Sequence, residues 1–168
     1  VPTHGTYRLN GRDVGKMSRN ELAAIRNEML GFIFQQYNLL PRLNLMENVE
    51  VPLVYAGISR AERHIRAREV LEQVGLGDKL KNRPNQLSGG MQQRVQISKA
   101  IANNPPILLL DEVTTGLDLS VQAKVLDLIR TIQQELGIAM MIVSHDLSVI
   151  RMMSDRTMVM LGGRVVEE

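Results

Sequence analysis

Residues 107–112 read ILLLDE, a short apolar run that ends in the adjacent carboxylates Asp111 and Glu112. A run of this length and composition predicts a buried strand. In open α/β sheets, ligands bind outside the carboxyl ends of the strands, which is where this pattern places both acids. Carboxylates at such an edge can bind a cation or orient a water molecule. Taken alone the pattern is weak, because strands that end in Asp-Glu also occur by chance.

Three further apolar runs predict strands at Met29–Phe34, Ile138–Val143 and Thr157–Leu161. Helical patterns separate the run at 107–110 from the two runs that follow it. Strands that alternate with helices in this way predict an α/β fold, in which a mostly parallel sheet is flanked by helices.

Three segments carry helix signals. The tetrapeptides SRNE and SRAE begin at Ser18 and Ser59, and each matches a capping box that starts a helix. We expect these helices to cover about residues 18–28 and 59–75. In Val121–Leu136 the apolar residues fall three or four apart and a glycine follows, which predicts an amphipathic helix packed on the sheet.

The composition excludes several classes of protein. The chain has 168 residues, 44% apolar and 23% charged, as is ordinary for one globular domain. It has no cysteine or tryptophan, which disfavours a disulfide scaffold, a thiolate metal site and an aromatic base-stacking surface. Its net charge of +2 is far from the basic excess of nucleic-acid-binding domains. The longest uncharged run, Met29–Pro41, is too short for a membrane-spanning helix.

A second stretch, LSGG at residues 87–90, predicts the start of a helix that runs to about Asn103. Ser88 is a favourable N-cap residue. The two glycines leave backbone N–H groups open at the positive end of the helix dipole, with no Cβ in the way of a phosphate. An ordinary capped helix after a glycine turn explains the pattern equally well.

Five features in a fixed order make the sequence resemble the ATP-binding cassette (ABC) family of transporter ATP-binding subunits. They lie in the family's order and at its approximate spacing: FQ at 34–35, LSGG at 87–90, the run that ends in DE at 111–112, GLD at 116–118 and SHD at 144–146. The resemblance covers nearly the whole chain, from a strand expected at Gly5–Leu9 to the sequence GRVVE at 163–167.

The resemblance implies a P-loop NTPase-like α/β fold with an inserted helical subdomain. We expect residues 1–168 to form part of an ABC nucleotide-binding domain, with about 1–35 and 96–168 in the α/β core and about 36–95 in the Q-loop and helical subdomain. The phosphate-cradling sequence G-x-x-x-x-G-K-[ST] is absent, and the only Gly-Lys pair, at 15–16, does not fit it. We therefore expect an N-terminally truncated cassette with little or no ATPase activity of its own.

The resemblance assigns roles to four residues near predicted strand ends. Asp111 resembles the Walker B aspartate that helps to hold Mg²⁺, and Glu112 resembles the general base that positions or activates water. His145 resembles the switch histidine that hydrogen-bonds the γ-phosphate and the base. Gln35 resembles the Q-loop glutamine, which touches Mg²⁺ and water near the membrane-spanning partner, with Gln36 as the second candidate.

The resemblance also implies a surface that acts on a second subunit. Ser88, Gly89 and Gly90 resemble the signature motif, which closes on the γ-phosphate of ATP held by the opposite subunit. Asp118 resembles the D-loop acid at the dimer interface, although a role as a helix N-cap fits its position equally well.

The implied function is an ATP-hydrolysing subunit of a membrane transporter that uses ATP and Mg²⁺. Its expected partners are a transmembrane permease and a second nucleotide-binding domain, with no nucleic acid. The permease would hold it at the cytoplasmic face of the membrane. The remaining histidines, His4 and His64, lie outside these motifs and are expected on the surface.

Three alternatives stay open. Residues 6–95 resemble lipoprotein-releasing and macrolide-export ATPases, whereas residues 115–168 resemble oligopeptide and phosphonate importers, so the direction of transport is undecided. The second alternative is a soluble ABC protein that acts in DNA repair, on chromosomes or in translation. The third is a catalytically incompetent cassette that only donates the signature half-site.

Overall fold

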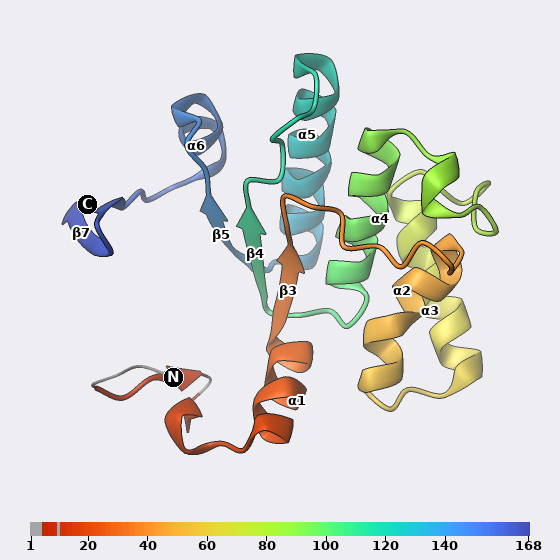
Figure 1. The fold of residues 1–168 in the computed structure, drawn as a ribbon, viewed down its shortest axis with the longest axis horizontal. Helices are drawn as coiled ribbons and strands as arrows, with labels where there is room; N and C mark the ends of the chain where they lie inside the picture. The colour runs from red at the N-terminus through yellow and green to blue at the C-terminus, as the bar shows by residue number, and fades with distance from the viewer. Residues whose placement is uncertain (1–4, 10) are drawn as a thin grey trace.

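The structure is a computed structural model that describes residues 5–9 and 11–168 (Figure 1). Its elements in chain order are β1 (Arg8–Leu9), β2 (Arg12–Asp13), the 3-10 turn η1 (Val14–Lys16), α1 (Arg19–Met29), β3 (Leu30–Ile33), α2 (Leu45–Tyr55), α3 (Arg60–Gln73), the 3-10 turn η2 (Pro84–Gln86), α4 (Gly89–Ile101), β4 (Ile107–Asp111), α5 (Leu119–Leu136), β5 (Ala139–Val143), α6 (Leu147–Met153), β6 (Val159–Leu161) and β7 (Arg164–Glu167). The expected surface residue His4 lies outside the described residues.

A three-stranded parallel sheet in the order β3-β4-β5 holds the predicted strands together. In this sheet Ile33 pairs with Leu110, and Asp111 pairs with Val143. The α/β fold with a parallel sheet and flanking helices is therefore confirmed for the middle of the chain.

The strand predicted at Thr157–Leu161 was wrongly placed in the parallel sheet. The strand is shorter, Val159–Leu161, and β6 pairs antiparallel with β7 in a sheet of its own. Gly162 and Gly163 both have positive φ, 57° and 79°. Two such residues form the tight turn of a β-hairpin, so this strand pairs with its sequence neighbour.

The strand expected at Gly5–Leu9 is also only partly present. It is reduced to Arg8–Leu9, which pairs antiparallel with Arg12–Asp13 and does not join the parallel sheet. The Gly-Lys pair at 15–16 follows within η1, where Lys16 forms an ion pair with Asp13 at 3.6 Å. This pair lies in a short 3-10 turn, so the prediction that it is not a phosphate-cradling loop agrees with its local structure.

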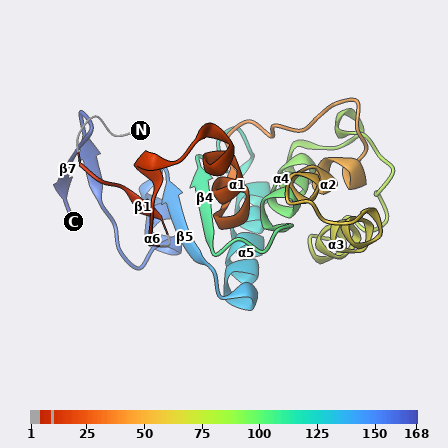
Figure 2. The same ribbon diagram turned by 90° about the horizontal axis from the view of Figure 1, so that it is seen from below.

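Helix α4 lies against β3 and links the sheet to the helices α2 and α3, which pack beside it (Figures 1 and 2). Gly31 in β3 makes the close approach possible. A Cβ on Gly31 would lie 2.5 Å from the carbonyl oxygen of Ala100 in α4 and 2.6 Å from Leu108 Cδ2. The bundle of α2, α3 and α4 corresponds to much of the predicted helical subdomain, whose boundaries at about 36–95 stay a prediction.

The predicted helix ends are largely confirmed. Ser18 and Glu21 form a complete capping box, with the Glu21 N–H 3.3 Å from Ser18 Oγ and the Ser18 N–H 2.7 Å from Glu21 Oε2. Ser59 caps α3 by accepting from the Glu62 N–H at 3.4 Å. The capping box predicted at SRAE is only half formed, because the Glu62 carboxylate pairs with Arg66 one turn later. Gly137 ends α5 in the left-handed conformation, as the sequence predicts. Helix α5 begins earlier than the apolar pattern indicates, because Asp118 is its N-cap.

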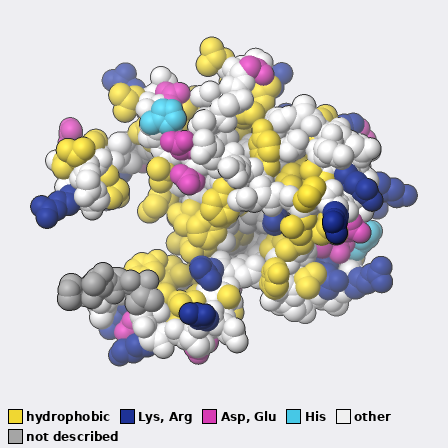
Figure 3. All heavy atoms as spheres, viewed as in Figure 1, with side chains coloured by type: hydrophobic (Ala, Val, Ile, Leu, Met, Phe, Trp, Pro, Cys, Tyr) yellow, Lys and Arg dark blue, Asp and Glu magenta, His cyan; other side chains and the backbone are white. Residues whose placement is uncertain are grey.

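The sheet leaves apolar side chains exposed on one face. Figure 3 shows hydrophobic side chains gathered over the parallel strands in this view. Phe32 and Phe34 are 36% and 39% exposed, and Met141 and Val143 in β5 are more than half exposed. The core lies behind this face, where Leu108 and Leu110 of β4 pack with α4 and α5.

Candidate functional site

The carboxyl ends of three parallel strands bring four of the eight predicted site residues to one edge of the sheet. Because Ile33 pairs with Leu110 and Asp111 pairs with Val143, the residues that follow each strand start from the same edge. Gln35 follows β3, Glu112 follows β4, and His145 follows β5. This is the edge at which open α/β sheets bind ligands.

Glu112 and His145 are in direct contact. His145 Nδ1 lies 2.8 Å from Glu112 Oε1, and the side chains are 72% and 32% exposed for His145 and Glu112, respectively. An ionised carboxylate can only accept hydrogen bonds, so the Nδ1–H of the imidazole donates to it. In the neutral tautomer Nε2 is then an acceptor, and in the imidazolium form it is a second donor. The pair therefore combines a candidate general base with an imidazole whose orientation the base fixes.

The backbone holds Glu112 in an unusual conformation. Its φ is +48°, in the left-handed region that few non-glycine residues occupy. The Glu112 N–H donates to the Val143 carbonyl at 3.0 Å, which extends the pairing of β4 with β5 by one residue. The Thr115 N–H donates to the Glu112 carbonyl at 3.1 Å and closes a turn. Strained residues of this kind cluster at functional sites.

Asp111 and Gln35 carry side-chain oxygen atoms at the same edge. Both side chains are exposed, Asp111 as the last residue of β4 and Gln35 two residues after β3. In the part of the chain that the structure describes, no three His, Cys, Asp or Glu residues are placed to hold a metal ion. Mg²⁺ often needs only one or two protein oxygen ligands, because substrate phosphates and water complete its shell. A carboxylate and an amide oxygen fit that type of site.

Ser88, Gly89 and Gly90 begin the helix α4. Ser88 is the N-cap and accepts from the Met91 N–H at 3.4 Å, and its side chain is exposed. Both glycines are needed for packing: a Cβ on Gly89 would lie 2.7 Å from the Tyr37 hydroxyl oxygen, and one on Gly90 would lie 2.6 Å from Val121 Cγ1. The motif thus presents the N-terminus of a 13-residue helix, as predicted. The hydrogen bond of Ser88 stays within its own helix, whereas Glu112 bonds to β5 and His145.

Asp118 serves as the N-cap of α5. Its Oδ1 accepts from the Ser120 hydroxyl at 2.7 Å and from the Val121 N–H at 2.9 Å. The Ser120 hydroxyl, and then the Val121 N–H, lower the pKa of the Asp118 carboxyl below its usual range. The N-cap interpretation of this residue is confirmed, and its place at a dimer interface stays a prediction. His64 pairs with Glu50 on the surface, as expected for a histidine outside the motifs.

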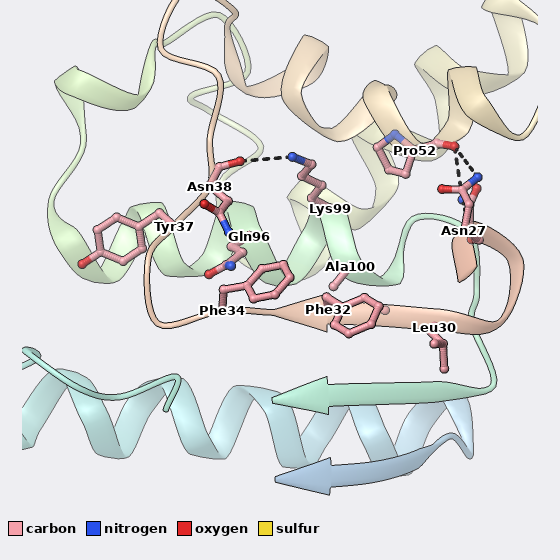
Figure 4. Close-up of a pocket in the computed structure, with 12 residues that line it drawn as sticks. Asn27, Leu30, Phe32, Phe34, Tyr37, Asn38, Pro52, Gln96, Lys99 and Ala100 are labelled. Carbon is pink, nitrogen blue, oxygen red and sulfur yellow. Dashed lines mark hydrogen bonds between the residues drawn. The ribbon is translucent and has the colours of Figure 1, made fainter. Parts of the chain in front are cut away.

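A groove beside β3 holds residues that the sequence analysis did not select (Figure 4). It encloses about 160 Å³, and its lining includes Phe32, Phe34, Tyr37, Gln96 and Lys99. The rings of Phe32 and Phe34 stack with centroids 5.5 Å apart. The alternation of two aromatic residues in the run at 29–34 was the available signal, because side chains two apart in a strand share a face.

The segment after Gln35 is tied to α4 by hydrogen bonds along this groove. Gln96 Nε2 donates to the Gln36 carbonyl at 3.2 Å, and Lys99 Nζ donates to the Asn38 carbonyl at 3.2 Å. Burial lowers the pKa of the Lys99 ammonium group. Gln36, the second candidate for the Q-loop glutamine, thus contributes its backbone to this contact.

The class of protein follows from these features together with the comparisons to known proteins. Residues 1–115 match the family described as ABC transporter. The chain belongs to the ABC transporter family, as its motifs indicate.

Similar proteins include both importers and exporters. An uncharacterized ABC transporter ATP-binding protein of Thermotoga maritima is 49% identical over 89% of this chain and 63% of its own length. The methionine import ATP-binding protein MetN of Corynebacterium glutamicum is 46% identical over 99% of this chain and 46% of its own length. The macrolide export ATP-binding/permease protein MacB of Marinobacter nauticus is 42% identical over 99% of this chain and 26% of its own length. The chain thus spans about half the length, or somewhat more, of several curated relatives.

A solved ABC cassette has the same fold. The dimeric structure of a post-hydrolysis state of the cassette MJ0796, bound to ADP and Pi, superposes with a TM-score of 0.85 at 39% sequence identity, covering 99% of this chain and 73% of that chain. The P-loop NTPase-like fold class expected from the resemblance is confirmed by this likeness. Of the residues that the structure describes, no helix is both long and apolar enough to cross a membrane.

Proposed function

We propose that this chain is part of the ATP-binding and ATP-hydrolysing subunit of an ABC membrane transporter. The observation that carries the proposal is the contact of Glu112 with His145 at the carboxyl edge of the sheet. The signature sequence at the start of α4 also supports the proposal. This chain, a member of the ABC transporter family, has both the signature sequence and the Glu112–His145 contact.

In the proposed mechanism Glu112 accepts a proton from, or orients, the water that attacks the terminal phosphate of ATP. The Nδ1–H of His145 holds the carboxylate in place, which leaves Nε2 as the ring nitrogen that would bond to the phosphate. Asp111 and Gln35 are the residues that would bind Mg²⁺, which neutralises charge on the phosphates when bound. Hydrolysis then depends on the position and charge of these groups.

Ser88, Gly89 and Gly90 would act on ATP held by a second nucleotide-binding domain. The hydroxyl of Ser88 and the free N–H groups at the start of α4 suit the negatively charged γ-phosphate. Asp118 would then lie near the interface of the two domains. The dimeric structure of MJ0796 bound to ADP and Pi supports this arrangement for a similar cassette.

The groove beside β3 is the proposed docking place for the transmembrane permease. Its exposed aromatic residues Phe32 and Phe34 can bury against a partner, and it begins next to Gln35. A permease seated there would hold the subunit at the cytoplasmic face of the membrane. Import and export stay equally open, since similar proteins of both kinds match 99% of the chain. The names of these relatives favour a transporter over a soluble repair, chromosome or translation protein.

Steady-state hydrolysis of ATP tests the proposal. The complete protein that contains this sequence, assembled with its permease, is expected to release phosphate from ATP only when Mg²⁺ is present, with faster release in the permease complex than alone. A protein that neither binds nor hydrolyses ATP, but completes the site of a different cassette, would instead be the half-site donor. Hydrolysis that never responds to a permease would favour a soluble ABC ATPase.

A further inference from the structure

Tyr37 lies between the groove and the signature motif. It follows Gln35 by two residues, its ring lines the groove, and its hydroxyl points to the start of α4. Figure 4 shows Tyr37 at one end of the groove, beyond Phe34 and Gln96. Within the described chain, Tyr37 is the groove residue that a Cβ added at a signature glycine, Gly89, would meet.

The contact with Gly89 is made by the phenol oxygen. A Cβ at position 89 would lie 2.7 Å from Tyr37 Oη but 3.8 Å from Tyr37 Cζ. The first distance is too short for any real carbon, and the second is an ordinary van der Waals contact. The hydroxyl of Tyr37 therefore lies against the first turn of α4 and occupies the space that a side chain at position 89 would need.

The rest of that segment is fixed to the same helix. The hydrogen bonds of Gln96 to the Gln36 carbonyl and of Lys99 to the Asn38 carbonyl hold the backbone on both sides of Tyr37. We therefore expect a displacement of the segment at the groove to move α4 as well, at Gly89 next to Ser88. Packed contacts of this kind carry energetic coupling between sites.

We propose that Tyr37 is a positioning residue for ATP hydrolysis, which sets the place of the signature helix N-terminus through its hydroxyl contact with Gly89. The inference rests on the proposed ATPase function, and it adds a residue that acts through Gly89 and does not touch the nucleotide.

A double-mutant cycle in the complete protein with its permease tests this contact. Gly89→Ala is expected to lower the maximal rate of ATP hydrolysis about tenfold or more, since misplacement of a catalytic group by about 1 Å can cost up to a hundredfold. Adding Tyr37→Phe removes the hydroxyl and leaves the ring, so the double variant Tyr37→Phe/Gly89→Ala is expected to recover to within about threefold of Tyr37→Phe alone.

Gly90 and Val121 provide the matched control. Gly90→Ala places its Cβ against Val121 Cγ1, and Val121→Ala removes that atom. Val121→Ala is expected to rescue Gly90→Ala, whereas Tyr37→Phe is not. The proposal is supported if Tyr37→Phe rescues Gly89→Ala but does not rescue Gly90→Ala. Failure of Tyr37→Phe to rescue Gly89→Ala, or equal rescue of both alanine variants, overturns it.

Two further measurements keep the test decisive if Gly89→Ala does not fold. Tyr37→Phe keeps the ring but loses the hydroxyl, so it is expected to lower the maximal rate about threefold, and Tyr37→Ala is expected to lower it about tenfold, each with a smaller change in KM for ATP. Equal maximal rates for Tyr37→Ala and the parent overturn the inference. A parent that hydrolyses no ATP contradicts the proposed function itself, which separates that failure from a missing Tyr37–Gly89 coupling in an active enzyme.

Discussion

Glu112→Gln in the complete protein is expected to slow ATP hydrolysis about a hundredfold or more, as expected when a positioned general base is removed. Glutamine keeps the size of the side chain but cannot accept a proton from water at neutral pH. It also replaces the carboxylate that accepts the Nδ1–H of His145 at 2.8 Å. The measurement is the rate of phosphate release at saturating ATP and Mg²⁺, with ATP binding followed separately by a fluorescent analogue.

ATP binding by Glu112→Gln is expected to stay near the parental level, because the substitution removes no ligand assigned to the phosphates. Glu28→Gln is the matched control, since Glu28 is an exposed residue of α1 away from the sheet edge. Its hydrolysis rate should equal that of the parent. Parental hydrolysis by Glu112→Gln would show that another residue is the base.

Leu110→Ala is expected to have the largest effect on stability, a loss of about 2–5 kcal/mol in the free energy of unfolding. Leu110 is 1% exposed and belongs to β4, the central strand of the parallel sheet. Truncation leaves a cavity between the sheet and its helices, directly before Asp111. Chemical denaturation followed by circular dichroism measures the change.

Leu161→Ala is the control for this prediction. Leu161 is 73% exposed in β6, so its truncation should change the free energy of unfolding by no more than about 0.5 kcal/mol. A similar loss in both variants would contradict the assignment of β4 to the core and of β6 to an exposed hairpin.

The parallel strands and the helix caps could be predicted because local signals decide them. The run ILLLDE became β4, and the Ser18 capping box starts α1. Helix α2 was missed although Asn44 and Glu47 form an equally complete capping box, with both hydrogen bonds at 2.8 Å. Its helical pattern is obscured by Pro52 within the helix, which removes a backbone donor. The helix packs against α3 and α4, a tertiary contact that the local sequence does not reveal.

The misplaced strand shows where strand patterns are insufficient. An apolar run such as 157–161 predicts a strand but does not say which strand it pairs with. The Gly162-Gly163 turn decides the pairing locally, in favour of β7. A glycine pair after a strand run is a hairpin signal that was present in the sequence.

The candidate site, like the fold, could be predicted from local sequence signals only in part. The sheet edge that holds Asp111 and Glu112 could be inferred from strand ends alone, whereas the partnership of Glu112 with His145 came only from the family resemblance. These residues are 33 positions apart, and their contact depends on the parallel pairing of β4 with β5. The proximity of Tyr37 to Gly89 could not be predicted, because it joins a loop to a helix 52 positions further along the chain.

The central claim is that this chain donates the signature half of an ATP site shared by two nucleotide-binding domains. Sedimentation velocity of the complete Glu112→Gln protein tests it most directly, because slow hydrolysis preserves the ATP-bound state. We predict a monomer without nucleotide, a dimer with ATP, and a monomer again when Ser88→Glu places a negative charge where the γ-phosphate would bind. A Glu112→Gln protein that stays monomeric with bound ATP, or a dimer that Ser88→Glu does not disrupt, would contradict the claim.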